Sequence, residues 1–255
     1  MRLATFNILH GRSVHDGDVD LSRLADAVAE LDADILALQE VDCDQPRSGK
    51  ADLTAVAAEA MNAVNHRFVA AISGTPGATW MAATGSEQPG TAAYGIALLS
   101  RYPVENWQVV RLPRIPFRFP MYVSGIQQFR IIHEEPRAAV VARVDTPLGP
   151  MTVANTHLSF VPNWNRVQLR HLVRDLRGFP GPRLLMGDLN MGPGRPARWH
   201  PLGSAPTFPA DEPTTQLDHI LTDDPSLTAG DCTAPRLAIS DHRALVVDIP
   251  VSAKP

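Results

Sequence analysis

Acid, amide and imidazole side chains follow short apolar segments at six places along the chain. One of these places reads Ile239-Ser240-Asp241-His242-Arg243 and precedes the apolar segment 244–249. A single strand end of this kind is usually only a solvated turn. Strand ends in packed sheets, however, meet at one edge, where binding sites tend to form. We therefore expect the following groups to come together: Asn7, Gln39-Glu40, Asn155-Thr156-His157, Asp188 with Asn190, Asp218-His219 and Asp241-His242.

These residue types favour one chemistry. Carboxylates beside an amide form the oxygen-rich site that hard cations such as Mg²⁺ prefer, and such a cation also binds water and substrate phosphate oxygens. Histidines donate hydrogen bonds to developing negative charge, and an aspartate can orient a water molecule or an imidazole. The set therefore indicates hydrolysis of a phosphoester, with Mg²⁺, or Mn²⁺ in its place, as the cofactor.

Other common chemistries have little support in the sequence. No glycine-rich phosphate-binding loop is present, so use of ATP is not implied. No Gly-x-Ser-x-Gly turn is present, and the serines have no evident base partner, which argues against acyl transfer. Cys43 and Cys232 are the two cysteines, and their spacing suggests neither a disulfide framework nor a zinc site.

The charge balance argues against a protein that binds long DNA. The formal net charge is -4, whereas a non-specific DNA binder is usually basic because phosphate contacts need Lys and Arg. Cleavage of a nucleotide or a short strand remains compatible with this charge. No apolar run approaches the length of a membrane span and no signal-peptide pattern is visible. We therefore expect a cytoplasmic protein.

Apolar periodicity predicts the elements that must position these groups. Helices are expected over 21–31, with Asp20 as the N-cap, over the alanine-rich segment 53–64 and over 166–176. Short apolar runs predict strands over 3–9, 35–38, 96–99, 183–186, 217–221 and 244–249. The segments 138–144 and 151–155 predict a hairpin, and the irregular region 73–92 predicts a surface loop.

The order of these elements indicates the fold class. Many predicted strands follow one another without an intervening helix, which fits two mixed β-sheets packed together with helices outside better than a parallel doubly wound sheet. The chain has 255 residues, of which 44% are hydrophobic and 20% charged, as in ordinary globular proteins. No linker is evident, so we favour a single α/β domain over residues 1–255.

Seven segments, in this order, resemble motifs of the endonuclease/exonuclease/phosphatase superfamily: TFNILHG, DILALQEVD, YGIALLSRYPV, ANTHLSF, LLMGDLNMGP, QLDHILTD and SDHRALVVDI. This group includes DNase I, the AP endonucleases, neutral sphingomyelinases and inositol-polyphosphate 5-phosphatases. Each motif alone is weak, but together they extend over almost the whole chain. The resemblance implies a DNase I-like fold, which is a four-layer α/β/β/α sandwich, and metal-dependent phosphoesterase activity.

The resemblance also implies how a metal ion would be held. Glu40 would be the main Mg²⁺ ligand. Asn7 and Asp241 would complete the metal site, directly or through water.

Five further residues would act on the phosphate according to the same resemblance. Asp188 would orient or deprotonate the attacking water. Asn190 and His157 would hold the phosphoryl oxygens. His242 would contact the scissile phosphate and stabilise the transition state, with Asp218 fixing its orientation.

Four further features concern residues outside the eight motif positions. In Tyr94-Gly95-Ile96-Ala97, isoleucine stands where bacterial members commonly have asparagine. The segment 114–134 interleaves arginines with aromatic residues, which is compatible with binding single-stranded nucleic acid, with contact to a lipid surface, or with a proline-kinked hairpin whose aromatics are core. Arg137 is interpreted as a buried structural partner rather than a catalyst, and His219 is expected to point away from the site.

The sequence therefore predicts a Mg²⁺-dependent phosphoester hydrolase, with phosphodiesterase as the favoured form, in which an aspartate-activated water attacks a metal-bound phosphate in line. The substrate stays open between a nucleic acid, a phospholipid head group and a small phosphoester. We expect a monomer. The alternative, a non-catalytic binding or scaffold protein on the same fold, is disfavoured because all eight motif residues are present.

Overall fold

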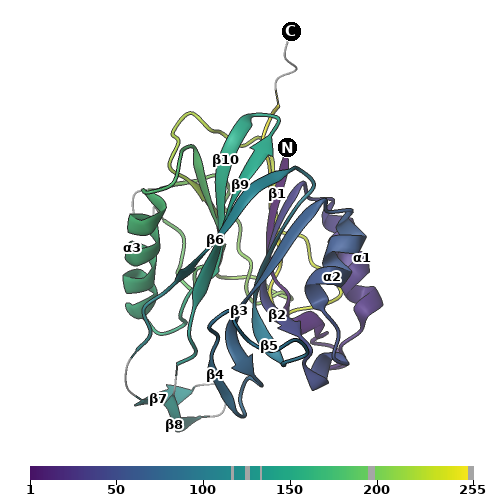
Figure 1. The fold of residues 1–255 in the computed structure, drawn as a ribbon, viewed down its shortest axis with the longest axis vertical. Coiled ribbons are helices and arrows are strands. Elements are labelled where there is room, and N and C mark those ends of the chain that lie inside the picture. The colour runs from purple at the N-terminus through teal and green to yellow at the C-terminus, as the bar shows by residue number, and fades with distance from the viewer. Residues whose placement is uncertain (116–117, 124–126, 133, 195–198, 252–255) are drawn as a thin grey trace.

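Two β-sheets lie face to face in the computed structural model, and helices cover their outer sides (Figure 1). The helices α1 (Leu21–Leu31) and α2 (Leu53–Met61) flank one sheet, and α3 (Trp164–Leu176) flanks the other. The structure describes residues 1–115, 118–123, 127–132, 134–194 and 199–251. The predicted α/β/β/α sandwich of two mixed sheets is confirmed.

Both sheets combine parallel and antiparallel strands. Over the described ranges, the first sheet has the order β14 (Cys232–Thr233), β15 (Leu245–Asp248), β1 (Arg2–Asn7), β2 (Ile35–Cys43), β5 (Ala93–Ser100), β3 (Asn65–Gly74) and β4 (Trp80–Ala82). The second has the order β12 (His200–Pro201), β13 (Asp218–Thr222), β11 (Arg183–Asp188), β10 (Gly149–His157), β9 (Ala138–Thr146) and β6 (Val104–Arg111). The pairs β1–β2 and β10–β11 are parallel, so their carboxyl ends lie at the same edge of each sheet.

Three smaller elements complete the described chain. The strands β7 (Phe119–Val123) and β8 (Gln128–Ile132) pair only with each other and form a separate ribbon. Two short 3-10 helices, η1 (Leu9–Gly11) and η2 (Pro46–Ser48), follow β1 and β2. Among the described residues, no helix has the length and apolar character needed to cross a bilayer.

Burial on both faces explains the continuous apolar runs of the central strands. Along β2, Ile35 and Ala37 point into the layer between the two sheets, whereas Leu36 and Leu38 pack under α1 and α2. A strand with two buried faces has no polar alternation. The helix α1 begins where predicted, because the side chain of Asp20 accepts a hydrogen bond from the Ser22 amide.

Several predicted boundaries differ from the structure. The helix predicted over 53–64 ends at Met61, because Asn62 adopts a left-handed backbone conformation (φ 56°) that terminates the helix. The strands β2, β5 and β11 are longer than predicted, because their backbone pairing continues beyond the predicted apolar runs. The region 73–92 was predicted as a loop, and this is wrong for Ser73 and Gly74, which end β3, and for the strand β4.

The segment 114–134 contains the β7–β8 ribbon. The interpretation of its aromatics as core is wrong for Phe129, whose exposed fraction is 74%. Residues 116–117, 124–126 and 133 of this segment, including Phe117, lie outside the described residues.

A buried amide network joins the two sheets beneath the edge where the polar groups gather. The Gln39 amide nitrogen donates to Asn155 Oδ1 at 2.8 Å, from β2 to β10. Asn155 Nδ2 in turn donates to the carbonyls of Leu38 and Ala97, at 2.8 and 2.7 Å. Both amide side chains are fully buried. Leaving a buried polar group without a hydrogen bond destabilises the folded protein. This network therefore fixes how the two sheets sit against each other.

Replacing Asn155 by alanine should destabilise the protein. The change removes the shortest contact of the Gln39 amide nitrogen, which keeps its contacts to Thr5 and Ala37, and the side-chain donor to two backbone carbonyls. Each buried polar group left unsatisfied costs about 1–3 kcal/mol. We expect the free energy of unfolding in urea to fall by about 3 kcal/mol or more. Asn106→Ala, on the exposed face of β6, serves as the control and should change it by less than about 0.5 kcal/mol. Equal stabilities for the two variants would contradict a structural role for the network.

Candidate active site

A cavity of about 400 Å³ opens at the edge where β1, β2, β10 and β11 bring their polar residues together. The carboxyl ends of the two parallel pairs meet there, as the strand order predicts. Six of the eight residues predicted for the site line this cavity: Asn7, Glu40, His157, Asp188, Asn190 and His242. Of the other two, Asp218 lies behind His242. Asp241 acts on Glu40 through its charge.

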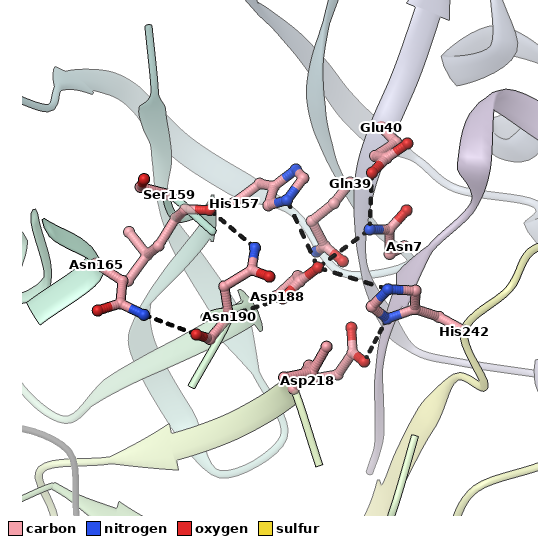
Figure 2. Close-up of polar contacts among 12 residues, drawn as sticks. Asn7, Gln39, Glu40, His157, Ser159, Asn165, Asp188, Asn190, Asp218 and His242 are labelled. Carbon is pink, nitrogen blue, oxygen red and sulfur yellow. Dashed lines mark hydrogen bonds and ion pairs between the residues drawn. The ribbon is translucent and has the colours of Figure 1, made fainter. Parts of the chain in front are cut away.

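Asp188 is the centre of the arrangement (Figure 2). Its side chain is almost fully buried. Asp188 Oδ2 accepts a hydrogen bond from Asn7 Nδ2 at 3.1 Å, and it lies 3.5 Å from His157 Nε2 and 3.9 Å from His242 Nε2. Asp188 Oδ1 accepts from the Asn190 backbone amide at 2.9 Å. The carboxylate therefore faces three side-chain donors from three different strands or turns.

Burial changes the acidity of this carboxyl group. Loss of solvent, followed by the negative charge of Asp218, raises the pKa of Asp188 to about 7. The positive charge of His242 and hydrogen bonds from Asn190 and Asn7 act in the opposite direction and are weaker. A carboxylate with a pKa near neutral is suited to accept a proton from water.

His242 is held in the charged state by Asp218. His242 Nδ1 donates to Asp218 Oδ2 at 2.9 Å, and both side chains are buried. Burial alone lowers the pKa of His242, but the hydrogen bond and the charges of Asp218, Asp188 and Asp241 outweigh this and raise the pKa to about 9. The imidazolium therefore presents its Nε2–H toward Asp188 and the cavity (Figure 2).

His157 has the opposite electrostatic environment. Burial and then the positive charges of Arg137 and His242 hold the pKa of His157 well below its usual value. His157 and His242 both direct Nε2 toward Asp188 Oδ2 (Figure 2). The site thus contains one neutral and one cationic imidazole on either side of one carboxylate.

Three residues in or beside the site have a left-handed backbone conformation. Glu40 has a φ of 56° at a β-bulge, where the pairing of β2 with β5 shifts register between Gln39 and Val41. Asn190 and Ser240 also have positive φ, at 50° and 73°. Such conformations cost about 1–3 kcal/mol each in non-glycine residues and tend to cluster at functional sites, although Asn62 adopts one at a helix end. The bulge at Glu40 re-aims its carboxylate, an effect that apolar periodicity alone does not predict.

Gly187 allows β11 to approach β10 just before Asp188. Its φ is 140°, and a Cβ atom there would lie 1.9 Å from the Thr156 carbonyl oxygen. A side chain at this position is therefore excluded. The close approach sets His157 and Asp188 opposite each other in the parallel register.

The carboxylates of Glu40 and Asp241 fit the requirements of a hard cation. Burial raises the pKa of Glu40, and the nearby negative charge of Asp241 raises it further, so a cation between them would relieve the repulsion. Asn7 Nδ2 donates to Glu40 Oε1 at 3.2 Å, while its Oδ1 accepts from the Leu9 amide. Because Asn7 directs its donor nitrogen toward Glu40, Asn7 would interact with a metal ion through water or through Glu40 and not as a direct ligand.

A second group of possible ligands overlaps with the residues already described. Asp188, Asp218 and His242 each offer one ligand atom, and these atoms lie within 4.8 Å of one another. Asp218 and His242 are hydrogen-bonded to each other, and Mg²⁺ prefers oxygen ligands to imidazole. The hydrogen bond between Asp218 and His242 therefore explains why these ligand atoms lie close together. The carboxylates of Glu40 and Asp241 suit a hard cation better.

Some polar residues near the site have structural partners. Asn190 Nδ2 donates to the Leu158 carbonyl at 3.0 Å, so its amide is anchored while it lines the cavity. His219 contacts the Met191 carbonyl at 2.9 Å and does not line the cavity, as predicted. Ser240, which the sequence analysis left out, donates to the Asn7 carbonyl and accepts from the His242 amide. It ties the two halves of the site together, and its place directly before Asp241-His242 is the only sequence signal for it.

Comparisons with known proteins agree with this architecture. Residues 4–242 match the sequence profile of the Endonuclease/Exonuclease/phosphatase family. No curated protein sequence matches the chain. Among solved structures, the endonuclease/exonuclease/phosphatase from Beutenbergia cavernae has a TM-score of 0.69 and 22% identity, over 98% of this chain and 71% of that chain.

Two further structures share the fold. The mannosyl-6-phosphatase from Bacteroides thetaiotaomicron has a TM-score of 0.63 and 15% identity, over 98% of this chain and 99% of that chain. The human Nocturnin catalytic domain, which holds a bound sulfate anion, has a TM-score of 0.62 and 17% identity, over 98% and 93%. At these identities the similarity establishes the fold.

The charge state of His242 can be measured directly. Its imidazole should titrate near pH 9 in the native protein, as followed by nuclear magnetic resonance. In Asp218→Asn the midpoint should fall by more than one pH unit, because burial then acts with less opposition. The pKa of His242 in the folded protein lies above its unfolded value, so protonation of His242 stabilises the folded state. This contribution to stability is fully present below about pH 6.5 and is lost as pH rises through about 9. A native midpoint at or below 6.5 would contradict the Asp218 interaction.

Proposed function

The chain belongs to the endonuclease/exonuclease/phosphatase family, whose members generally hydrolyse phosphoester bonds with a divalent metal ion. We propose that this chain is likewise a metal-dependent phosphoester hydrolase and acts as one catalytic domain. The observation that carries the proposal is the position of Asp188. This carboxylate lies in a cavity of about 400 Å³, with a pKa raised to about 7 and three side-chain nitrogens around one oxygen.

In this proposal Asp188 accepts the proton of the attacking water. The water would lie between the carboxylate and the phosphorus and attack in line with the leaving oxygen. A base with a pKa near the working pH combines a large ionised fraction with sufficient basicity. Asn7 and the Asn190 amide hold the carboxylate in place, so water is oriented by a fixed group.

The two imidazoles are proposed to bind the phosphoryl oxygens. His157 and His242 present Nε2 toward the same oxygen of Asp188, Oδ2. A phosphoryl oxygen between them would accept from both, and the charge on His242 would favour the transition state, in which negative charge builds up. Asn190 lines the same wall and is proposed to assist.

Glu40, Asp241 and Asn7 are proposed to hold the divalent ion, Mg²⁺ or Mn²⁺. When bound, such an ion polarises the phosphate and neutralises charge on the leaving oxygen. Glu40 is the best placed, because it lines the cavity and is hydrogen-bonded by Asn7. Asp241 adds the second negative charge that a dication needs.

The cavity wall supports a small phosphoester as the substrate within the three classes considered. Glu134 and Glu135 also line the cavity, as does Arg137. Carboxylates there would repel the further phosphates of a nucleic acid strand, which binds best to a continuous basic surface. The similar mannosyl-6-phosphatase is named for a small phosphomonoester, and a compact phosphodiester or phosphomonoester fits the same argument.

Metal dependence provides the first test. The purified protein should hydrolyse bis-p-nitrophenyl phosphate or p-nitrophenyl phosphate with Mg²⁺ or Mn²⁺ and lose this activity in EDTA. Glu40→Gln should lower kcat/KM about 10²–10³-fold, the range for loss of one electrostatic contact to the transition state. It should also abolish the rise in melting temperature on adding metal.

Glu59→Gln is the matched control, because Glu59 is exposed on α2 and does not line the cavity. It should retain both the activity and the metal response. A metal-induced rise in melting temperature without hydrolysis of small esters, single- or double-stranded DNA, RNA or sphingomyelin would instead support a binding protein on the same fold.

A further inference from the structure

Arg137 contacts His157 on the side that faces away from Asp188. Arg137 Nη1 lies 3.1 Å from His157 Nδ1. The exposed fractions of the two residues are 6% and 7%. Arg137 immediately precedes β9, whose strand neighbour β10 ends at His157. The contact is thus buried and is set by the pairing of two adjacent strands.

The chemistry of the two groups decides the direction of the hydrogen bond. A guanidinium group stays protonated in proteins and has donors only. His157 Nδ1 must therefore accept, which requires that it carry no proton. An imidazole without a proton on Nδ1 is neutral and carries its proton on Nε2.

The remaining nitrogen is the one that faces the cavity. His157 Nε2 lies 3.5 Å from Asp188 Oδ2 (Figure 2). His242 reaches the same oxygen from the other side, but its Nδ1 donates to Asp218 instead of accepting. The residues that bond to Nδ1 of the two histidines therefore have opposite charges. This residue is an arginine for His157 and an aspartate for His242.

We propose that Arg137 is a positioning residue that holds His157 as the neutral tautomer with its proton on Nε2, so that His157 is a fixed hydrogen-bond donor to a phosphoryl oxygen and takes no part in proton transfer. This inference rests on the proposed phosphoesterase function and deepens it. It distinguishes the two histidines by what bonds to Nδ1: an arginine fixes the neutral tautomer of His157, whereas the Nδ1 of His242 donates to a carboxylate.

The surroundings of Arg137 favour this role over a purely structural one. Its nearest carboxylate oxygen among the described residues is Glu135 Oε2, at 3.9 Å, which is longer than a hydrogen bond. Its Nε atom is buried and has no hydrogen-bond partner within the described part of the chain. A buried cation held only for stability is normally paired closely with a carboxylate. Here the short contact is made to the imidazole, and the charge faces the cavity that would take a phosphate.

The tautomer of His157 can be measured without any substrate. Nitrogen-15 nuclear magnetic resonance distinguishes a protonated from an unprotonated ring nitrogen. In the native protein His157 should show a protonated Nε2 and an unprotonated Nδ1. Arg137→Met, which removes donor and charge but keeps a long apolar side chain, should abolish this preference, and Arg137→Lys, which retains a donor, should restore it in part.

Kinetics on a small phosphoester complete the test. Arg137→Met should lower kcat on the order of 10- to 100-fold, the effect typical of removing the outer partner of a site histidine, with a smaller change in KM. Arg137→Lys should recover part of this loss. Arg143→Met is the matched control, because Arg143 lies on β9 and bonds to Thr152 and the Pro180 carbonyl instead. It should change neither kcat nor the spectrum of His157.

Three results would overturn the inference. One is a native His157 with a proton on Nδ1. Another is an Arg137→Met variant that is inactive although its His157 spectrum is native, since Arg137 would then act on the substrate itself. The third is an altered tautomer with native kcat. If the native protein hydrolyses no phosphoester, the proposed function fails separately, and the spectrum of His157 still decides whether Arg137 sets its tautomer.

Discussion

A carboxylate removed from water at the end of β11 is the constraint on which the rest of the site depends. Asp188 is about 1% exposed, and an isolated buried carboxylate would be strongly unfavourable. The chain meets this cost with donors from several elements: Asn7 ends β1, His157 ends β10, and His242 follows Ser240 in the turn before β15. The two sheets must therefore be aligned closely, and the buried Gln39–Asn155 network accounts for that alignment.

The two imidazoles beside this carboxylate are hydrogen-bonded at Nδ1 by residues of opposite charge. Asp218 keeps His242 positively charged, whereas Arg137 contacts His157 from the side where a proton would otherwise bind. Two cationic imidazoles would lower the pKa of Asp188 and weaken it as a base, while two neutral ones would leave the buried charge poorly compensated. One of each gives both a basic carboxylate and one positive charge for the phosphate.

Much of the fold could be predicted from the sequence because it follows from local patterns. The helix α1 and the β9–β10 hairpin were predicted correctly, since apolar spacing, an N-cap and a turn specify them. The gathering of polar residues at one edge also followed from strand ends. The bulge at Glu40 could not be predicted, because a positive φ in a glutamate depends on the surrounding sheet. Likewise, the contact of Arg137 with His157 joins residues 20 positions apart through strand pairing.

The most direct test of this account is the nearly isosteric change Asp188→Asn, measured for both activity and stability at pH 8. As a general base, Asp188 should contribute about 10²–10⁴-fold to kcat. Because its folded pKa, about 7, lies above the unfolded value, ionisation of Asp188 opposes folding at pH 8. The account therefore predicts an inactive variant whose melting temperature is equal to or higher than that of the native protein, with an intact response to metal. A folded Asp188→Asn protein with native kcat, or one that loses activity only because it unfolds, would contradict it.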